Sequence, residues 1–355
     1  MKLPIDPGEA IVVVGALATK PPDRNLQRHE IHPVQVFTAD GVEPVPALDH
    51  GEFGMSALVI RAEAGVVYGS SGNDFFRVDL ADGTITDLGV DLKDSHEVTE
   101  IDGALWIANT GRDEAVEFDL ATEKVSRRVP VRSTRASTPS SAGPTPPRAS
   151  EPTGSGETVD KFHANQIVRG LDGRVYVLVH HVDGKQIVKY VAQRLVKMQG
   201  NGGVIELETG RPVPLALSGP HSIQVVGADE QWICDSRAGV LRVYDRDWRE
   251  HAQIPCAGWG RGVSVSQASG RVYVGISSIR KRYLQVIPTS QHSQNMLQAF
   301  DIAGRTLIGE TVVPHIETIN NVYVVSRETA ERLLRVSPRP ARRGPDLTAG
   351  PPSSR

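Results

Sequence analysis

Short apolar segments of strand length recur along most of the chain, and the first kind is centred on an aromatic residue. Segments rich in β-branched and aromatic residues over a few positions predict β-strands. Six copies occur: Val67-Tyr68, Leu105–Ile107, Val175–Val177, Gln231–Ile233, Val272–Val274 and Val322–Val324. The recurrence predicts an all-β chain built from repeated units.

Two further kinds of segment follow the aromatic one in most units. The first alternates apolar and polar residues and ends near an acidic residue: Phe76–Asp79, Val116–Asp119, Val204–Glu208, Leu241–Asp245 and Leu297–Asp301, with an extra copy at Val34–Phe37. The second closes the unit: Thr84–Leu88, Lys124–Val129, Pro212–Leu215 and Thr306–Ile308, with an extra copy at Glu43–Pro46. Asp-Gly pairs such as Asp82-Gly83 mark tight turns between strands. Each unit is therefore expected to hold four short strands.

Units of four short strands at intervals near 40 residues are typical of the blades of a β-propeller. Tyr68 and Trp106 are 38 positions apart, and Trp232 and Tyr273 are 41 apart. Six copies predict an all-β fold with six blades. The N-terminal copy lacks a clear inner strand and the C-terminal copy lacks outer strands. We therefore expect a split blade, in which His315–Ser326 is the innermost strand beside Val34–Phe37. The alternative is a seven-bladed ring in which Ile11–Val14 is a remnant blade.

Domain organisation follows from the composition of the longer segments. Residues 1–336 are expected to form a single propeller domain. Residues 133–157 are dense in Ser, Thr, Pro and Gly and nearly free of apolar residues, and residues 337–355 are rich in Pro and Arg. Such segments cannot bury enough apolar surface to fold, so we predict a disordered insertion and a disordered tail.

Charge and cysteine content exclude several classes of function. The net charge of −3 gives no basic surface for nucleic acid. The sequence contains no run of about 18 apolar residues, so no membrane span is expected. Asp6 and Glu9 near the start argue against a secretory signal peptide, and the two cysteines, Cys234 and Cys256, are too few for a disulfide framework. We expect a cytoplasmic protein with both thiols reduced; the oligomeric state is not predicted.

The predicted inner strands carry the most informative polar residues. Four of the six begin with a histidine: His96, His163, His221 and His315. In a fifth the same place is taken by Arg261, and the remaining strand begins with Phe53–Ser56. Because inner strands line the channel, we expect these side chains to converge at one mouth of it.

A converging set of imidazoles supports two kinds of chemistry. Neutral imidazole is the commonest protein ligand for zinc and iron, and His96, His163, His221 and His315 are the candidate ligands. Without a metal, His96, His163 and His221 would act as acids and bases, and Arg261 would hold an anionic group. Two alternatives stay open: Glu317 rather than His315 faces the channel, or the polar residues only bind water.

Three more arginines follow second strands, where the connecting loops flank the same mouth. They are Arg112, Arg237 and Arg280, and they are candidates for binding an anionic substrate. The alternative is that they are ordinary solvated turn residues.

The blades resemble those of the broad group of NHL, strictosidine-synthase-like and gluconolactonase-like propellers. Pro220–Ser222, Arg261-Gly262 and Gly275–Arg280 are more closely similar to an uncharacterised bacterial propeller family. The resemblance implies a six-bladed fold and no agreed activity. The gluconolactonase-like calcium site needs acidic and Asn ligands where this chain has His, so calcium is not implied.

The sequence thus predicts an enzyme that acts on a small polar or anionic molecule at a histidine-lined channel mouth, with or without a divalent metal. A lyase, a hydrolase and an oxygenase are equally compatible with these residues. The alternative is a non-catalytic propeller that binds a small molecule or a protein.

Overall fold

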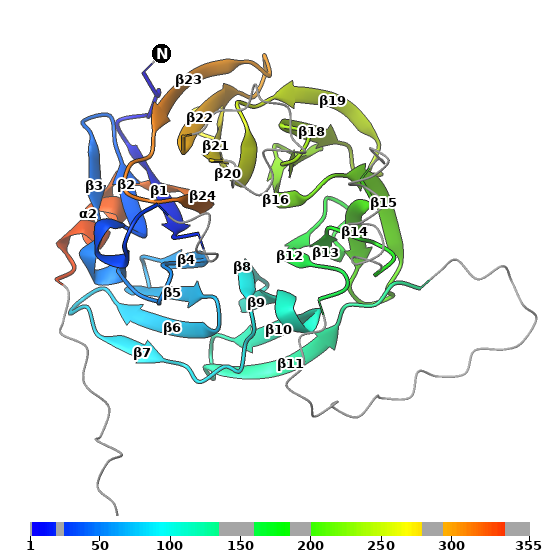
Figure 1. The fold of residues 1–355 in the computed structure, drawn as a ribbon, viewed down its shortest axis with the longest axis horizontal. Helices are drawn as coiled ribbons and strands as arrows, with labels where there is room; N and C mark the ends of the chain where they lie inside the picture. The colour runs from blue at the N-terminus through cyan, green and yellow to red at the C-terminus, as the bar shows by residue number, and fades with distance from the viewer. Residues whose placement is uncertain (1, 19–24, 135–159, 185–199, 279–293, 338–355) are drawn as a thin grey trace, which may run out of the picture.

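The computed structural model describes residues 2–18, 25–134, 160–184, 200–278 and 294–337. In this part of the chain the strands form six four-stranded antiparallel sheets, which stand around a central opening (Figure 1). The fold is therefore the predicted six-bladed propeller. The predicted disordered segments, 133–157 and 337–355, lie outside the described residues except for residues 133, 134 and 337.

Blades are numbered here by the chain order of their innermost strands. From the inside outward, blade 1 is β4 (Ala57–Arg61), β5 (Val66–Ser71), β6 (Asp74–Asp79) and β7 (Ile85–Asp87), and blade 2 is β8 (Ser95–Ile101), β9 (Ala104–Asn109), β10 (Glu114–Asp119) and β11 (Lys124–Pro130). Blade 3 is β12 (Ala164–Arg169), β13 (Val175–Val179), β14 (Gly202–Glu206) and β15 (Pro212–Leu217), and blade 4 is β16 (Pro220–Val226), β17 (Glu230–Asp235), β18 (Val240–Tyr244) and β19 (Glu250–Pro255). Blade 5 is β20 (Trp259–Ser266), β21 (Arg271–Ser277), β22 (Met296–Asp301) and β23 (Leu307–Val312). Blade 6 is β24 (Thr318–Ser326), β1 (Glu9–Ala16), β2 (Val34–Phe37) and β3 (Val42–Pro44).

Blade 6 joins the two ends of the chain. β24 pairs with β1 along its whole length, from Glu9 opposite Ser326 to Ala16 opposite Thr318. The predicted split blade is confirmed, with the C-terminal segment innermost. The seven-bladed alternative is wrong, because Ile11–Val14 lies within β1, the second strand of this blade.

The continuous apolar run Ile11–Val14 is explained by burial on both faces of blade 6. Successive side chains of a strand point to opposite faces of its sheet. Val12 and Val14 pack into the core cluster shared with blade 1, whereas Ile11 and Val13 pack into the cluster shared with blade 5. The hydrophobic core of the molecule thus consists of layers between neighbouring blades.

Tyr323, the aromatic residue of the C-terminal copy, lies in the inner strand β24, whereas the aromatic residues of the other five copies lie in second strands. There its hydroxyl accepts a hydrogen bond from Leu58 N–H of blade 1 at 2.8 Å. The composition of β24 resembles that of a second strand, and its register is decided by a partner at the other end of the chain.

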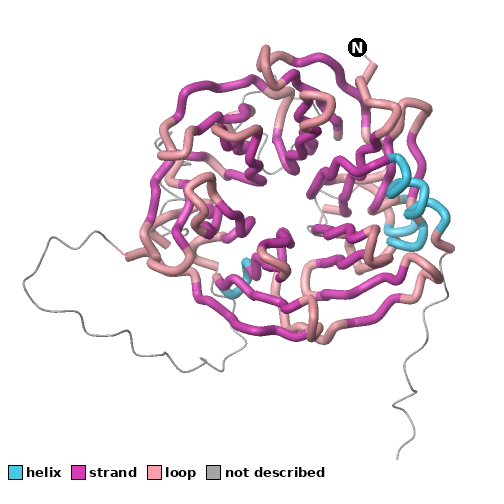
Figure 2. Tube along the Cα trace, turned by 180° about the vertical axis from the view of Figure 1, so that it is seen from behind, coloured by secondary structure: helices cyan, strands magenta, loops and turns pink. Residues whose placement is uncertain are grey.

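A short helix follows the closing strand. α2 (Arg327–Arg335) begins at the N-cap Ser326, whose hydroxyl accepts from Thr329 N–H at 3.1 Å, which satisfies one of the free amide groups of the first turn. Ala330 and Leu333 bury against blades 6 and 1, and Figure 2 shows the helix at the periphery of the ring. Neither this helix nor the short 3-10 turns in the described part of the chain could span a bilayer.

Both cysteines carry free thiols. Cys234 is buried in β17, and Cys256 is partly buried just after β19. The expectation that neither forms a disulfide is confirmed.

Ring closure gives the first test. Truncation at Pro314 removes β24 and exposes the edge of β1, so we expect the cooperative thermal unfolding transition of the whole ring to be lost. Truncation after Ser337 is the matched control, and it should leave the transition temperature unchanged. Circular dichroism melting curves measure both. A Pro314 truncation that keeps the wild-type transition would contradict the closure.

Candidate functional site

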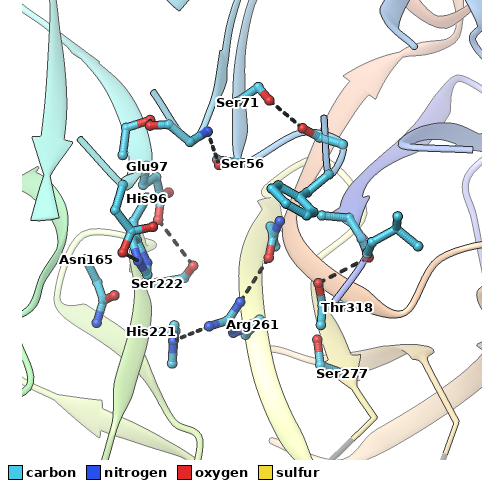
Figure 3. A pocket seen from close by; sticks show the side chains of 18 of the residues that line it. Ser56, Ser71, His96, Glu97, Asn165, His221, Ser222, Arg261, Ser277 and Thr318 are labelled. Atoms are coloured by element: carbon cyan, nitrogen blue, oxygen red, sulfur yellow. Dashed lines mark hydrogen bonds and ion pairs between the residues drawn. The ribbon is translucent and has the colours of Figure 1, made fainter. Parts of the chain in front are cut away.

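Pairing with the second strand aligns the inner strands. In each of blades 1 to 5 the second strand carries an aromatic residue, and the residue after it pairs with a residue of the inner strand: Leu58, Val98, Ile167, Ile223 and Val263. The second strand of blade 6 has no aromatic residue, and there we take Val322, opposite Val13, as the equivalent residue. Two positions earlier stand the six residues that we call the mouth ring: Ser56, His96, Asn165, His221, Arg261 and Asn320. All six line a cavity of about 900 Å³ at the channel mouth, and Figure 3 labels all of them except Asn320.

Backbone irregularities turn this ring toward the axis. Five of the six inner strands shift register within one or two residues of the ring position, and β4 is the regular one. Bulges of this kind commonly re-aim a side chain next to a functional site. The polar residues therefore leave the alternation of the sheet and enter the channel.

Arg261 is held in place from both sides. Its Nη2 lies 3.0 Å from Nε2 of His221, and its Nη1 donates to Oδ1 of Asn320 at 2.9 Å (Figure 3). Asn320 in turn donates through Nδ2 to the carbonyl of Met55 at 2.7 Å. A chain of hydrogen bonds thus connects blades 4, 5, 6 and 1, one after another, through Arg261 and Asn320.

The other contacts of His221 fix its tautomer. Nδ1 lies 2.8 Å from Oγ of Ser236 and 3.0 Å from the carbonyl of Gly219. Ser236 donates its own proton to the carbonyl of Gly260 at 2.6 Å, so the proton between the two side chains belongs on Nδ1. The lone pair of Nε2 is then free to accept from Arg261. Burial, reinforced by Arg261, holds the pKa of His221 well below its usual value, so His221 is neutral and positions Arg261.

His163 lies two residues before the ring position of blade 3, in a left-handed conformation (φ 54°) that histidine tolerates better than most residues. Its Nδ1 is 3.0 Å from Oδ2 of Asp160. A carboxylate at one ring nitrogen holds a proton there and leaves the other nitrogen as the basic one. His163 therefore has the arrangement of a general base that acts through Nε2.

His180 is a cavity residue that the repeat pattern did not identify. It follows β13, whose end runs antiparallel to the start of β12, and its N–H donates to the carbonyl of His163 at 3.3 Å. Its ring lies between those of His163 and His221, with centroid distances of 4.3 and 5.3 Å. Burial holds its pKa well below the usual value, and Nε2 is buried without a hydrogen-bond partner among the described residues.

His96 completes a row of four imidazoles. Its ring centroid is 5.0 Å from that of His163, and its Nε2 is 3.8 Å from Oδ2 of Asp94. Burial lowers the pKa of His96. The contact with His96 in turn lowers the pKa of Asp94 to about 2. We call His96, His163, His180 and His221 the histidine row. The prediction that His96, His163, His221 and Arg261 meet at one mouth agrees with this geometry.

His315 lies away from the cavity. It is exposed, and its ring packs against that of His32 at 4.8 Å. Glu317 is buried, but its carboxylate accepts from the backbone amides of Ala18 and Leu26 at 2.7 and 2.6 Å, and also from that of Asn25. Neither of the two residues considered for blade 6 lines the cavity, and Asn320 takes that place. The cause is the shifted register of β24 described above.

Two of the three loop arginines lie outside the cavity wall, and the third is not among the described residues. Arg112 forms a two-pronged ion pair with Asp91 at 2.6 and 2.7 Å on the surface. Arg237 donates its N–H to the carbonyl of Ser218 and does not line the cavity. Arg280 lies outside the described residues.

Metal ligation has no preformed geometry in the part of the chain that the structure describes. No group of three or more His, Cys, Asp or Glu side chains there is arranged to hold a metal ion. One nitrogen of His221 already faces Arg261, and one nitrogen of His163 faces Asp160. A zinc or iron site shared by His96, His163 and His221 stays a prediction.

Comparison with known proteins supports the fold alone. No family model matches the chain. A chain in the crystal structure of a nidogen/laminin complex is similar over 89% of this chain and 98% of its own, with 11% identity and a TM-score of 0.54. A Bacteroides caccae protein of unknown function is similar over 90% and 99%, with 10% identity and a TM-score of 0.54. A provisionally assigned 6-phosphogluconolactonase from Bacteroides fragilis is similar over 90% and 98%, with 12% identity and a TM-score of 0.49.

Glu97, the neighbour of His96, gives a test of how dry the cavity wall is. Its side chain is buried, Ser222 Oγ donates to Oε2 at 3.4 Å, and burial raises its pKa to about 7. A group whose pKa rises on folding stabilises the native state at low pH, and that stability is lost as the pH rises through 7. A shift from 4.5 to about 7 corresponds to roughly 3 kcal/mol.

We therefore expect Glu97→Gln to be more stable than the wild type at pH 8–9 and about equal to it at pH 5, by denaturant unfolding. Glu100→Gln, on the same strand but exposed, is the control and should follow the wild type. Parallel pH profiles for Glu97→Gln and wild type would show that Glu97 is solvated.

Proposed function

We propose that the protein is an enzyme that binds a small anionic molecule at the channel mouth and acts on it by general acid–base catalysis. The observation that carries this proposal is the fixed guanidinium of Arg261 beside the histidine row, within one cavity. A cavity of about 900 Å³ is within the range of small-molecule sites in general.

Arg261 is the anion anchor in this proposal. The guanidinium presents a planar fork that matches carboxylate or phosphate oxygens. Its bonds to His221 and Asn320, which are both neutral partners, orient the guanidinium toward the cavity that it lines. A preoriented cation in a partly dry cavity favours binding of the anion and stabilises negative charge that develops during reaction.

His163 is the general base in this proposal, with Asp160 as its orienting partner. His96 and His180 flank it, and their low pKa values keep both neutral near pH 7. Neutral imidazoles beside a bound anion can take a proton from the substrate and return it to a leaving group, a contribution of about 10²–10⁴ in rate. These residues suit proton abstraction, elimination and hydrolysis alike.

A divalent metal would extend the chemistry to a metal-dependent lyase, hydrolase or oxygenase. Metal analysis of tag-free protein tests the zinc or iron prediction. One equivalent per chain, lost in His163→Ala, would favour the metal-dependent form.

The proposal is tested with a panel of small carboxylates, hydroxy acids, lactones and phosphate monoesters. Binding is measured as a rise in melting temperature, since a ligand that binds only the native state stabilises it, and turnover is measured by proton NMR. We expect Arg261→Gln to weaken binding of carboxylate hits at least tenfold, the loss of roughly one charge-assisted bond. Arg112→Gln, outside the cavity, should bind like the wild type.

Each outcome is informative. Conversion of a hit supports the enzyme, and binding without conversion supports the non-catalytic small-molecule alternative. Equal behaviour of Arg261→Gln and Arg112→Gln would contradict the anion site.

Two substitutions distinguish a His221 that positions Arg261 from a His221 that acts as a general base. In His221→Gln the side-chain carbonyl can still accept a hydrogen bond from Arg261 but cannot transfer a proton, whereas His221→Ala offers neither. We expect His221→Gln to keep most of the anion affinity and activity, and His221→Ala to lose about tenfold in affinity. If His221 transfers protons itself, both variants will be equally inactive while Arg261-dependent binding persists.

A further inference from the structure

The charges of the cavity wall are divided between its two sides. Among the described lining residues, the exposed acidic side chains are Glu52, Asp74 and Asp94, which come from the loop before β4, the start of β6 and the loop before β8. All of these lie on the side of blades 1 and 2. The guanidinium of Arg261 comes from β20 of blade 5.

These two sides face each other across the channel. In a ring of six blades, blades 2 and 5 are half a turn apart, and Figure 1 shows β8 and β20 on opposite sides of the central opening. Asp94 directly precedes β8 and Arg261 lies within β20. A ligand that lies across the mouth therefore meets carboxylates at one end and a guanidinium at the other.

Hydrogen bonds hold the backbone at Asp94 in place. The amide of Asp94 donates to Oδ1 of Asn73 at 3.0 Å, and that of Ser95 donates to the carbonyl of Gly72 at 2.6 Å. Asp94 itself is held in the left-handed conformation (φ 52°), and its side chain stays 65% exposed. The neighbouring His96 lowers the pKa of Asp94 to about 2, so Asp94 is a carboxylate at every physiological pH.

Between the two charges lies the histidine row. His96, His180 and His221 are neutral near pH 7, and neutral imidazole nitrogens accept hydrogen bonds from N–H donors. Nε2 of His180, in the middle of the row, is buried without a hydrogen-bond partner among the described residues. A polar atom left in that state is costly unless a ligand or water satisfies it, which is a second indication that a polar ligand group, donor or acceptor according to the tautomer of His180, binds here.

We propose that the ligand of this cavity is zwitterionic: a small amino-acid-like molecule whose carboxylate binds Arg261 and whose protonated amine lies on the side of Asp94. This inference rests on the proposed anion site and narrows its substrate class. A plain monoanion would use only Arg261, and a dianion would place its second charge against Glu52, Asp74 or Asp94. The ammonium group instead finds carboxylate and imidazole acceptors on its side.

Isothermal titration of the full-length protein tests the inference with three matched series: ω-amino carboxylates of increasing chain length, the alkanoates of the same lengths, and the alkylamines of the same lengths. We expect the best amino carboxylate to bind at least tenfold more tightly than its alkanoate and its alkylamine, because each carries one of the two charges. Asp94→Asn should abolish the advantage over the alkanoate and leave alkanoate affinity unchanged or higher. Asp102→Asn, at the other end of β8, is the control and should keep the wild-type ranking.

The outcomes distinguish this inference from the proposed function. Equal affinities of amino carboxylates and alkanoates, both lost in Arg261→Gln, would overturn the zwitterion and leave the anion site intact. The zwitterion proposal would also be overturned if amino carboxylates still bound more tightly than alkanoates in Asp94→Asn, as they should in Asp102→Asn. Absence of binding by all three series at millimolar concentration would count against both proposals.

Discussion

The pairing of β24 with β1 is the interaction on which the rest of the structure depends. It closes a ring whose core consists of layers between blades, so every layer is bounded on both sides only when the ring is complete. The same strand carries Asn320, which orients Arg261, and Tyr323, which joins blade 6 to blade 1. The candidate site is therefore not local to any blade. Its central cation is oriented by a residue that is in place only after closure.

The sequence was sufficient for those parts of the molecule that repeat locally. Four strands per unit and six units could be predicted, because the strands of blades 1 to 5 are neighbours in the sequence. The split blade followed from the incomplete copies at the two ends, and His96, His163, His221 and Arg261 were recognisable from their equivalent places in the repeat. The register of β24 could not be predicted, since its partner lies about 300 residues away. His315 was expected to open this strand, but the strand begins at Thr318, and Asn320 is the residue that lines the cavity. His180 was recognisable only from its place after a second strand, where antiparallel pairing brings it beside His163.

The candidate site combines a strained backbone with histidines that burial keeps uncharged. Asp94, His163 and Ser222 all line the cavity with positive φ, a conformation that costs non-glycine residues free energy and that is concentrated at functional sites. His96, His180 and His221 have their pKa lowered by burial, so these three imidazoles add no positive charge beside Arg261 near neutral pH. Among the described lining residues, Arg261 then faces the acidic side chains of blades 1 and 2 across a polar wall. Such an arrangement recognises a ligand by the separation of its charges as much as by their sign.

The split blade also has a consequence for synthesis of the chain. β2 is synthesised soon after β1 and covers one of its edges, but β24, which covers the other edge, is made about 300 residues later. At roughly 5–20 residues per second, the wholly apolar Ile11–Val14 waits about 15 to 60 s with an open edge. During translation the nascent protein thus resembles a substrate for a holding chaperone. Slow codons between those for β2 and those for β24 would lengthen the interval in which aggregation competes with closure.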